Sequence, residues 1–142
     1  MTDRPELSIV IVSFNTETMT CECLDSIYAN AAGLDFEIIV VDNASSDKSV
    51  ELIEQRFPNV ALIKNKDNRG FAAANNQAFA IARGNHILLL NSDTIILDHA
   101  ALIEFPADDG FVDADIADAD NDAIYFTRGT HITMASGEQR RI

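Results

Sequence analysis

A short apolar run that ends abruptly in polar residues constrains the fold of this chain more than any other stretch. The run ILLL at 87–90 is followed directly by NSDT at 91–94. Four unbroken apolar residues between polar ones are typical of a strand that is covered on both faces, as in a parallel sheet. Ligands of open α/β sheets bind at the carboxyl ends of such strands. The stretch therefore predicts a buried strand with a site at its tip, although the same polar residues also form ordinary turns and helix caps.

Asn91 and Asp93 are the candidate ligand-binding residues at this tip. They are two residues apart, so in an extended segment both side chains point to the same side. A carboxylate and an amide at this spacing can hold a divalent cation together with a sugar hydroxyl.

The residues before this tip alternate predicted strands with predicted helices. Apolar patterns predict strands at 7–12, 36–41 and 60–64, and helices at about 18–30, 48–57 and 71–82. This alternation is the pattern of a parallel sheet with right-handed crossovers. The polar residues that follow each strand are then expected at one edge of the sheet.

Composition excludes several classes of protein. A chain of 142 residues is long enough for one domain with a real core. Its formal net charge of -13 argues against nucleic-acid binding, which depends on basic surface. Two cysteines at 21 and 23 favour neither a disulfide nor a zinc site, and no apolar run approaches the roughly 20 residues of a membrane span. We expect a cytoplasmic protein, either free or at the inner face of the membrane.

Four motifs occur in order along the chain. They are VSFN at 12–15, VVDNASSD at 40–47, NRGFAAANN at 68–76 and LNSDT at 90–94. Together they resemble the nucleotide-binding half of family 2 inverting glycosyltransferases with the GT-A fold, especially the rhamnosyltransferase-like branch. The resemblance covers about residues 7–97. It implies a Rossmann-like α/β fold with a mainly parallel central sheet flanked by helices, which binds a nucleotide sugar.

The first two motifs imply a pocket for the nucleotide base. In this family the acid that closes the second strand contacts uracil or thymine, which assigns that role to Asp42, beside Asn43. Ser13 and Asn15 would line the same pocket. A carboxylate only accepts hydrogen bonds, so it suits the imide N–H of these bases. The alternative is a loop residue that bonds its own backbone.

The third motif implies contacts to the rest of the donor. Gly70 would let the backbone approach the ligand, Arg69 would meet a phosphate, and Asn75 or Asn76 would face the nucleotide sugar from the helix. The alternative is an ordinary helix with a glycine at its entry.

The fourth motif stands where the family has its D-x-D motif. Asp93 matches the acid that holds Mg²⁺ or Mn²⁺ against the diphosphate. Asn91 departs from the commoner first Asp; its amide can reach a ribose hydroxyl but adds no negative charge. Metal affinity is therefore expected to depend on Asp93 and on the diphosphate itself.

The resemblance fades beyond residue 97. Such enzymes need a second half with an acceptor site and a carboxylate base, and no residue here matches that base, including Asp108, Asp109, Asp113 and Glu138. The chain is therefore expected to be shorter than a complete enzyme. We expect a nucleotide-sugar-binding domain at 1–105 and an acidic tail at 106–142. Beyond residue 97 the sequence predicts a short helix at 98–105, a solvated or disordered acidic run at 108–122, and strands at 124–127 and 130–134.

Two functions remain open. The first is a metal-dependent inverting glycosyltransferase that transfers a sugar from a UDP- or dTDP-sugar to a hydroxyl of a glycan or lipid-linked glycan, as in cell-envelope polysaccharide synthesis. The alternative is a non-catalytic nucleotide-sugar-binding or interaction module. Such a module could associate, with itself or another protein, through the sheet edge that the missing half leaves open.

Overall fold

A computed structural model describes residues 4–97, 123–127, 131–134 and 139–141. The first seven elements are β1 (Leu7–Ser13), α1 (Glu17–Asn30), β2 (Phe36–Asp42), α2 (Ser49–Arg56), β3 (Ala61–Lys64), α3 (Phe71–Ile81) and β4 (His86–Asn91). Three further strands follow: β5 (Ala123–Thr127), β6 (His131–Met134) and β7 (Gln139–Arg141). The predicted elements up to β4 are confirmed to within one residue at each end. The strands expected at 124–127 and 130–134 are also present, whereas β7 was not predicted.

All strands belong to one sheet in the order β3-β2-β1-β4-β5-β6-β7. The neighbours from β3 to β4 are parallel, and those from β4 to β7 are antiparallel. The predicted α/β fold with a mainly parallel sheet is therefore confirmed for β1 to β4. Since β5 pairs along β4, that edge of β4 is covered, and the outer strands of the described sheet are β3 and β7.

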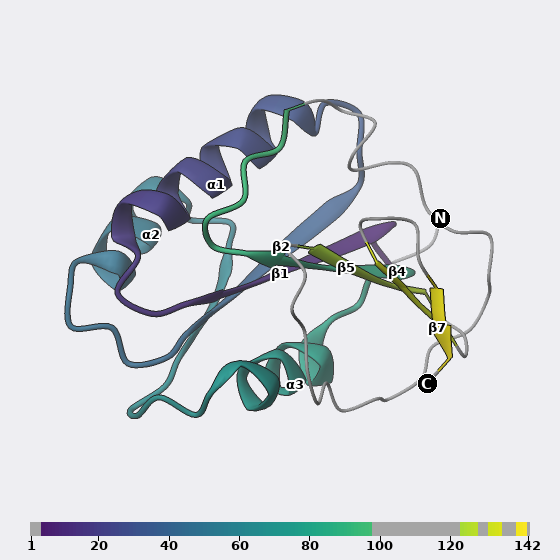
Figure 1. The fold of residues 1–142 in the computed structure, drawn as a ribbon. Coiled ribbons are helices and arrows are strands. Elements are labelled where there is room, and N and C mark those ends of the chain that lie inside the picture. The colour runs from purple at the N-terminus through teal and green to yellow at the C-terminus, as the bar shows by residue number, and fades with distance from the viewer. Residues whose placement is uncertain (1–3, 98–122, 128–130, 135–138, 142) are drawn as a thin grey trace.

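The helices cover both faces of the parallel strands (Figure 1). Alternate residues of each strand face opposite sides, so Ile9 and Leu88 pack in the cluster with α1 and α2, while Val10 and Leu89 pack in the cluster with α3. Burial on both faces explains why the run at 87–90 is apolar without interruption.

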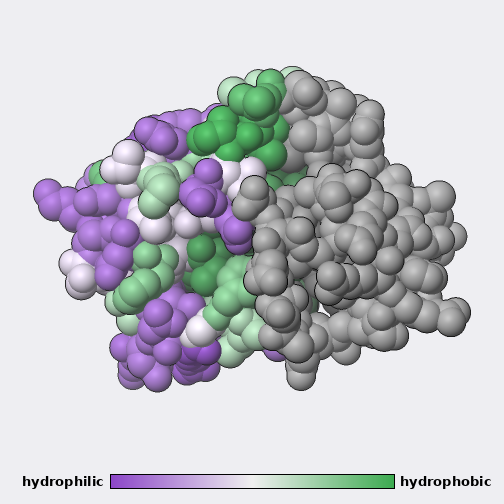
Figure 2. All heavy atoms as spheres, in the orientation of Figure 1, coloured by the Kyte–Doolittle hydropathy of each residue, from purple (hydrophilic) through white to green (hydrophobic). Residues whose placement is uncertain are grey.

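The parallel strands deliver their following loops to one edge. β1, β2 and β4 are aligned in register, with Ser13 opposite Asp42 and Val12 opposite Asn91. Figure 2 shows hydrophilic residues gathered on the left side of the molecule, where these loops lie in the orientation of Figure 1. We refer to this side as the carboxyl edge.

The helix expected at 98–105 and the acidic run at 108–122 lie outside the described residues. Within the described part of the chain, no helix combines the length and the apolar character that crossing a membrane requires.

Candidate functional site

The loops after β1 and β2 are bonded to each other at the carboxyl edge. The N–H of Asn15 donates to Ser45 Oγ at 2.9 Å, and the N–H of Ser46 donates to Asn15 Oδ1 at 2.7 Å. Asn15 has a φ of 53°, which asparagine tolerates better than most residues. Its Oδ1 is therefore engaged in holding the neighbouring loop.

Asp47 joins the starts of two helices. Its carboxylate accepts from the N–H of Glu17, the first residue of α1, at 3.1 Å, and from the N–H of Ser49, the first residue of α2, at 2.9 Å. Helix N-termini carry unpaired N–H groups and partial positive charge, so a carboxylate is stabilised there. Partial burial acts to raise the pKa of Asp47, but hydrogen bonds from Ser49 and Glu17 outweigh it and hold the pKa below its usual range.

Asp42 closes β2 and is 2% exposed. Its two oxygens accept from the N–H and the hydroxyl of Ser45, at 2.9 and 2.6 Å. In the sequence between Asp42 and Ser45, Ala44 has a φ of 67°, a strained conformation for a residue with a Cβ. An ionised carboxylate has about four acceptor sites, so these two bonds leave acceptor capacity, but at 2% exposure Asp42 presents almost no surface to a ligand in this structure.

Ser13 lies beneath this loop rather than in it. Its side chain is fully buried, with its hydroxyl 3.2 Å from that of Thr20. Its carbonyl accepts from the N–H of Asn43 at 2.8 Å. Ser13 thus supports the loops from below and offers no surface to a ligand.

The loop before α3 presents Arg69 and Gly70. Arg69 is exposed, and its Nε lies 3.7 Å from Asp67 Oδ1. Gly70 has a φ of 83°, and a Cβ there would meet nothing within 4 Å, so glycine is favoured by backbone conformation rather than by lack of space. Asn43 donates from Nδ2 to the carbonyl of Gly70 at 3.1 Å.

The two asparagines on α3 lie in different environments. Asn75 is 1% exposed and donates to the carbonyl of Phe71 at 3.0 Å. Asn76 is half-buried. Of the pair, only Asn76 retains accessible surface for a ligand.

The tip of β4 carries Asn91 and Asp93. Asn91 is half-buried, Asp93 is exposed, and the N–H of Thr94 donates to the carbonyl of Asn91 at 3.0 Å in a tight turn. Burial, followed by the negative charge of Asp93, raises the pKa of Cys23 to about 12. The Cys23 thiol is therefore neutral at ordinary pH and is not a candidate nucleophile.

The donor set at this tip fits a divalent cation that is shared with a ligand. Among the described residues, no three His, Cys, Asp or Glu side chains lie close enough to hold a metal by themselves. β4 ends at Asn91 and Asp93 lies in the turn that follows, so the extended tip expected to carry both side chains on one side is not present. The carboxylate of Asp93 is the hard oxygen donor here, and Mg²⁺ commonly takes one or two carboxylates together with phosphate oxygens. A cation at this tip would therefore need further oxygen ligands from a bound molecule or from water.

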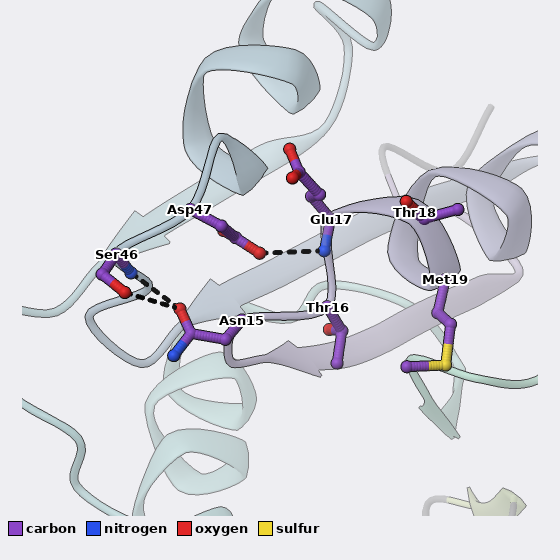
Figure 3. Close-up of a pocket in the computed structure, with 7 residues that line it drawn as sticks. All are labelled: Asn15, Thr16, Glu17, Thr18, Met19, Ser46 and Asp47. Atoms are coloured by element: carbon purple, nitrogen blue, oxygen red, sulfur yellow. Dashed lines mark hydrogen bonds between the residues drawn. The ribbon is translucent and has the colours of Figure 1, made fainter.

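A cavity of about 530 Å³ opens beside the first loop (Figure 3). Its lining residues are Asn15, Thr16, Glu17, Thr18, Met19, Ser46 and Asp47. Asp42, Arg69 and Asp93 are not among them, so this hollow flanks the predicted site residues rather than enclosing them.

Several residues that shape the edge were not predicted from sequence. Asp47 ends the second motif but was assigned no role of its own, and its bond to α1 spans 30 residues of sequence. Thr16 Oγ1 donates to Ser92 Oγ at 3.2 Å across 76 residues. Asn65 and Gln77 pair across 12 residues, and neither belongs to a motif. For Asp47 the local signal is that Ser and Asp just before a helix are the residue types that cap helix N-termini.

The parallel sheet, its flanking helices and the loops at its carboxyl edge define an α/β protein of the GT-A type. The family model described as glycosyl transferase family 2 matches residues 8–134, so the chain belongs to that family. The match extends past residue 97, where the motif resemblance ended.

Similar proteins include a poly(ribitol-phosphate) beta-glucosyltransferase of Bacillus spizizenii, 38% identical over 68% of this chain and 16% of that protein. A PGL/p-HBAD biosynthesis glycosyltransferase of Mycobacterium bovis is 31% identical over 72% of this chain and 41% of that protein. The chain thus spans less than half the length of both relatives.

Solved structures agree on the fold. A mannosyltransferase from Pyrobaculum calidifontis, in complex with GDP-Man and Mn²⁺, superposes with a TM-score of 0.64 at 27% identity, over 71% of this chain and 31% of that one. TarS 1-349 from S. aureus, in complex with UDP-GlcNAc, gives a TM-score of 0.61 at 25% identity, over 68% of this chain and 29% of that one.

Proposed function

We propose that this chain forms the donor-binding part of a metal-dependent, inverting glycosyltransferase that uses a UDP- or dTDP-sugar. The observation that carries the proposal is the exposed carboxylate of Asp93 at the tip of β4, beside an edge already built from the β1 and β2 loops. The sugar would pass to a hydroxyl of a glycan or lipid-linked glycan.

Each side chain at the edge has a distinct task in this proposal. Asp42 accepts from the base with its remaining capacity, which requires the loop after β2 to uncover a carboxylate that is 2% exposed in the free chain, and Asn15 lies beside it. Arg69 approaches the diphosphate as an exposed cation. Asn91 bonds a ribose hydroxyl, and Asn76 faces the donor from α3. Ser13 and Asn43 act from below, because their polar groups bond the loops themselves.

Asp93 is the metal ligand in this proposal. A bound Mg²⁺ or Mn²⁺ would neutralise charge that develops on the diphosphate as it leaves. The Mn²⁺ and GDP-Man of the Pyrobaculum mannosyltransferase and the UDP-GlcNAc of TarS support such a ligand. The Asn at 91 in place of Asp supports the rhamnosyltransferase-like branch.

Calorimetric titration of the purified chain tests the donor site. UDP, dTDP and GDP are each titrated with Mn²⁺ and again with EDTA, in wild type and in Asp93→Ala. We expect binding of a pyrimidine nucleotide that requires the metal and is lost in the variant. If folded wild-type protein binds no nucleotide, the donor-site proposal is wrong; a preference for GDP overturns only the choice of base.

Turnover separates the enzyme from a binding module. Release of UDP or dTDP from the donor sugar, dependent on Mn²⁺ and on Asp93, would support retained chemistry. Donor binding without release in the presence of candidate acceptors would favour the non-catalytic module instead.

A further inference from the structure

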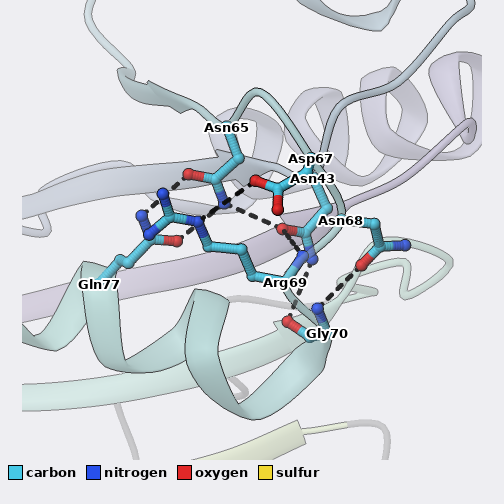
Figure 4. Close-up of polar contacts among 7 residues, drawn as sticks. All are labelled: Asn43, Asn65, Asp67, Asn68, Arg69, Gly70 and Gln77. Carbon is cyan, nitrogen blue, oxygen red and sulfur yellow. Dashed lines mark hydrogen bonds and ion pairs between the residues drawn. The ribbon is translucent and has the colours of Figure 1, made fainter.

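Three amide side chains form a bonded network behind the Arg69 loop (Figure 4). Asn65 and Gln77 make a reciprocal pair, with Asn65 Nδ2 donating to Gln77 Oε1 at 2.8 Å and Gln77 Nε2 donating to Asn65 Oδ1 at 2.9 Å. Asn65 Nδ2 also lies 2.9 Å from Asn43 Oδ1. We call Asn43, Asn65 and Gln77 the amide network.

The network connects three parts of the fold. Asn43 follows β2, Asn65 follows β3, and Gln77 lies in the second turn of α3. The N–H of Asn65 donates to the carbonyl of Asp42 at 2.9 Å, which attaches the loop's start to the site. The 65–70 loop is thus anchored to the sheet on one side and to the helix on the other.

Asn43 carries the network to the end of the loop. Its Oδ1 also accepts from the N–H of Arg69 at 3.4 Å, and its Nδ2 donates to the carbonyl of Gly70 at 3.1 Å. Asn43 is 2% exposed, so an acceptor or donor left unpaired there would be costly. The orientation of its amide is therefore determined by these bonds, and the backbone at Arg69 and Gly70 follows from it.

We propose that Asn65 and Gln77 are positioning residues that hold the 65–70 loop in its donor-binding shape. This inference rests on the proposed function, since it assigns the loop's ligand as the diphosphate of the nucleotide sugar. Arg69 meets that diphosphate as an exposed side chain on a backbone that is already ordered. The conformational cost of ordering the loop is then met on folding instead of on binding.

How firmly the 65–70 loop is held can be measured without a ligand, by its rate of cleavage by trypsin. Lys66 and Arg69 are trypsin sites within it, and both are exposed. Cleavage of a native loop requires it to open locally, so its rate reports how firmly the loop is held. Loss of the amide pair is expected to speed cleavage at these two sites.

The test uses four variants of the full chain. Asn65→Ala and Gln77→Ala each remove the reciprocal pair. The double variant Asn65→Gln/Gln77→Asn exchanges the two amides while keeping the summed side-chain length. Gln55→Ala is the control, because Gln55 is an exposed residue of α2 outside the network. Thermal unfolding confirms that each variant is folded.

Nucleotide affinity with Mn²⁺ and tryptic cleavage of the free protein are measured in each. We expect the two alanine variants to bind the best wild-type nucleotide about three- to tenfold more weakly and to be cleaved faster at Lys66 and Arg69. The exchanged pair should recover most of both, and Gln55→Ala should match wild type.

The outcomes separate this inference from the proposed function. If wild type binds nucleotide and the alanine variants bind it equally well, the amide network does not position the loop and the inference alone is overturned. If wild type binds no nucleotide, the proposed function fails first, and the inference fails with it because the loop then lacks its ligand. Weaker binding with unchanged cleavage would also overturn the positioning role.

Discussion

Three aspartates at the carboxyl edge differ in whether other protein groups hold their carboxylates. Asp42 accepts two hydrogen bonds from Ser45 in its own loop, and Asp47 accepts one from the first residue of each of α1 and α2. Asp93, which follows β4 on the other side of β1, is exposed at a turn, and its charge acts on the pKa of Cys23. The first two carboxylates help to hold the loops at the carboxyl edge in place, and we call the hydrogen bonds that do so the frame. The carboxylate of Asp93 remains open to solvent and to ligands.

This contrast separates stability from binding within one small region. Binding groups that are held in advance lose little freedom when a ligand arrives, so a bonded frame favours affinity. A metal ligand must instead remain free of competing protein bonds. Substitutions at the three aspartates are therefore expected to divide into those that unfold the chain and those that only release the ligand.

Asp42→Ala is expected to have the largest effect, because it damages frame and site together. The N–H and hydroxyl of Ser45 lose their acceptor at a position where Ala44 is already strained, at a cost of about 1–3 kcal/mol. Urea unfolding should show this loss, and nucleotide binding should disappear. Asp42→Asn keeps one acceptor oxygen and should be milder; equal stability of wild type and Asp42→Ala would contradict the frame role.

Asp93→Asn should weaken binding without weakening the fold. It removes only the charge of an exposed side chain, so the free energy of unfolding is expected within about 0.5 kcal/mol of wild type. Metal-dependent nucleotide affinity should fall about 10- to 100-fold, as for loss of one charged contact. Calorimetry with Mn²⁺ and urea unfolding of the same sample measure both. A strongly destabilised variant would place Asp93 in the frame after all.

Asp47→Asn is expected to cost about 1 kcal/mol through weaker capping of α1 and α2. Because the folded pKa of Asp47 is lowered, its contribution is complete above the ordinary value of 3.8 and is lost as the pH falls through the lowered pKa. Unfolding by urea at about pH 7 and about pH 3 should show the wild-type advantage shrinking toward acid. An advantage that grows in acid would contradict this assignment.

The same division explains what the sequence could predict. Strand and helix positions followed from local periodicity, and the candidate residues Asp42, Arg69, Gly70 and Asp93 came from motifs within short segments. The bonds that build the frame span 30 residues for Asn15 with Ser45, 12 for Asn65 with Gln77 and 76 for Thr16 with Ser92. Polar pairs of this kind have no periodic pattern, because they depend on which loops the sheet brings together.

The order of strands was also beyond local pattern. The sequence predicts parallel crossovers, but it does not say that β1 lies between β2 and β4. That placement puts Ser13 opposite Asp42 and Val12 opposite Asn91. Asn75 and Asn76 were equivalent in the motif, and only the packing of α3 buries one and leaves the other accessible.

Asn91→Asp is expected to have the smallest effect of these substitutions, and it tests how far charge at the tip of β4 controls binding. A second carboxylate two residues from Asp93 would add negative charge where the metal binds, and hard cations prefer charged oxygen ligands. The two carboxylates would also repel each other in the metal-free protein, which partial exposure to water reduces. We therefore expect Mn²⁺-dependent nucleotide affinity to rise only a few-fold, with unfolding unchanged within about 0.5 kcal/mol. Titration of Mn²⁺ at constant nucleotide measures the gain, and Asn91→Ala controls for loss of the amide. Lower Mn²⁺-dependent nucleotide affinity in both Asn91→Asp and Asn91→Ala would mean that the amide itself contacts the donor, and that its hydrogen bond to the ribose outweighs any gain in charge.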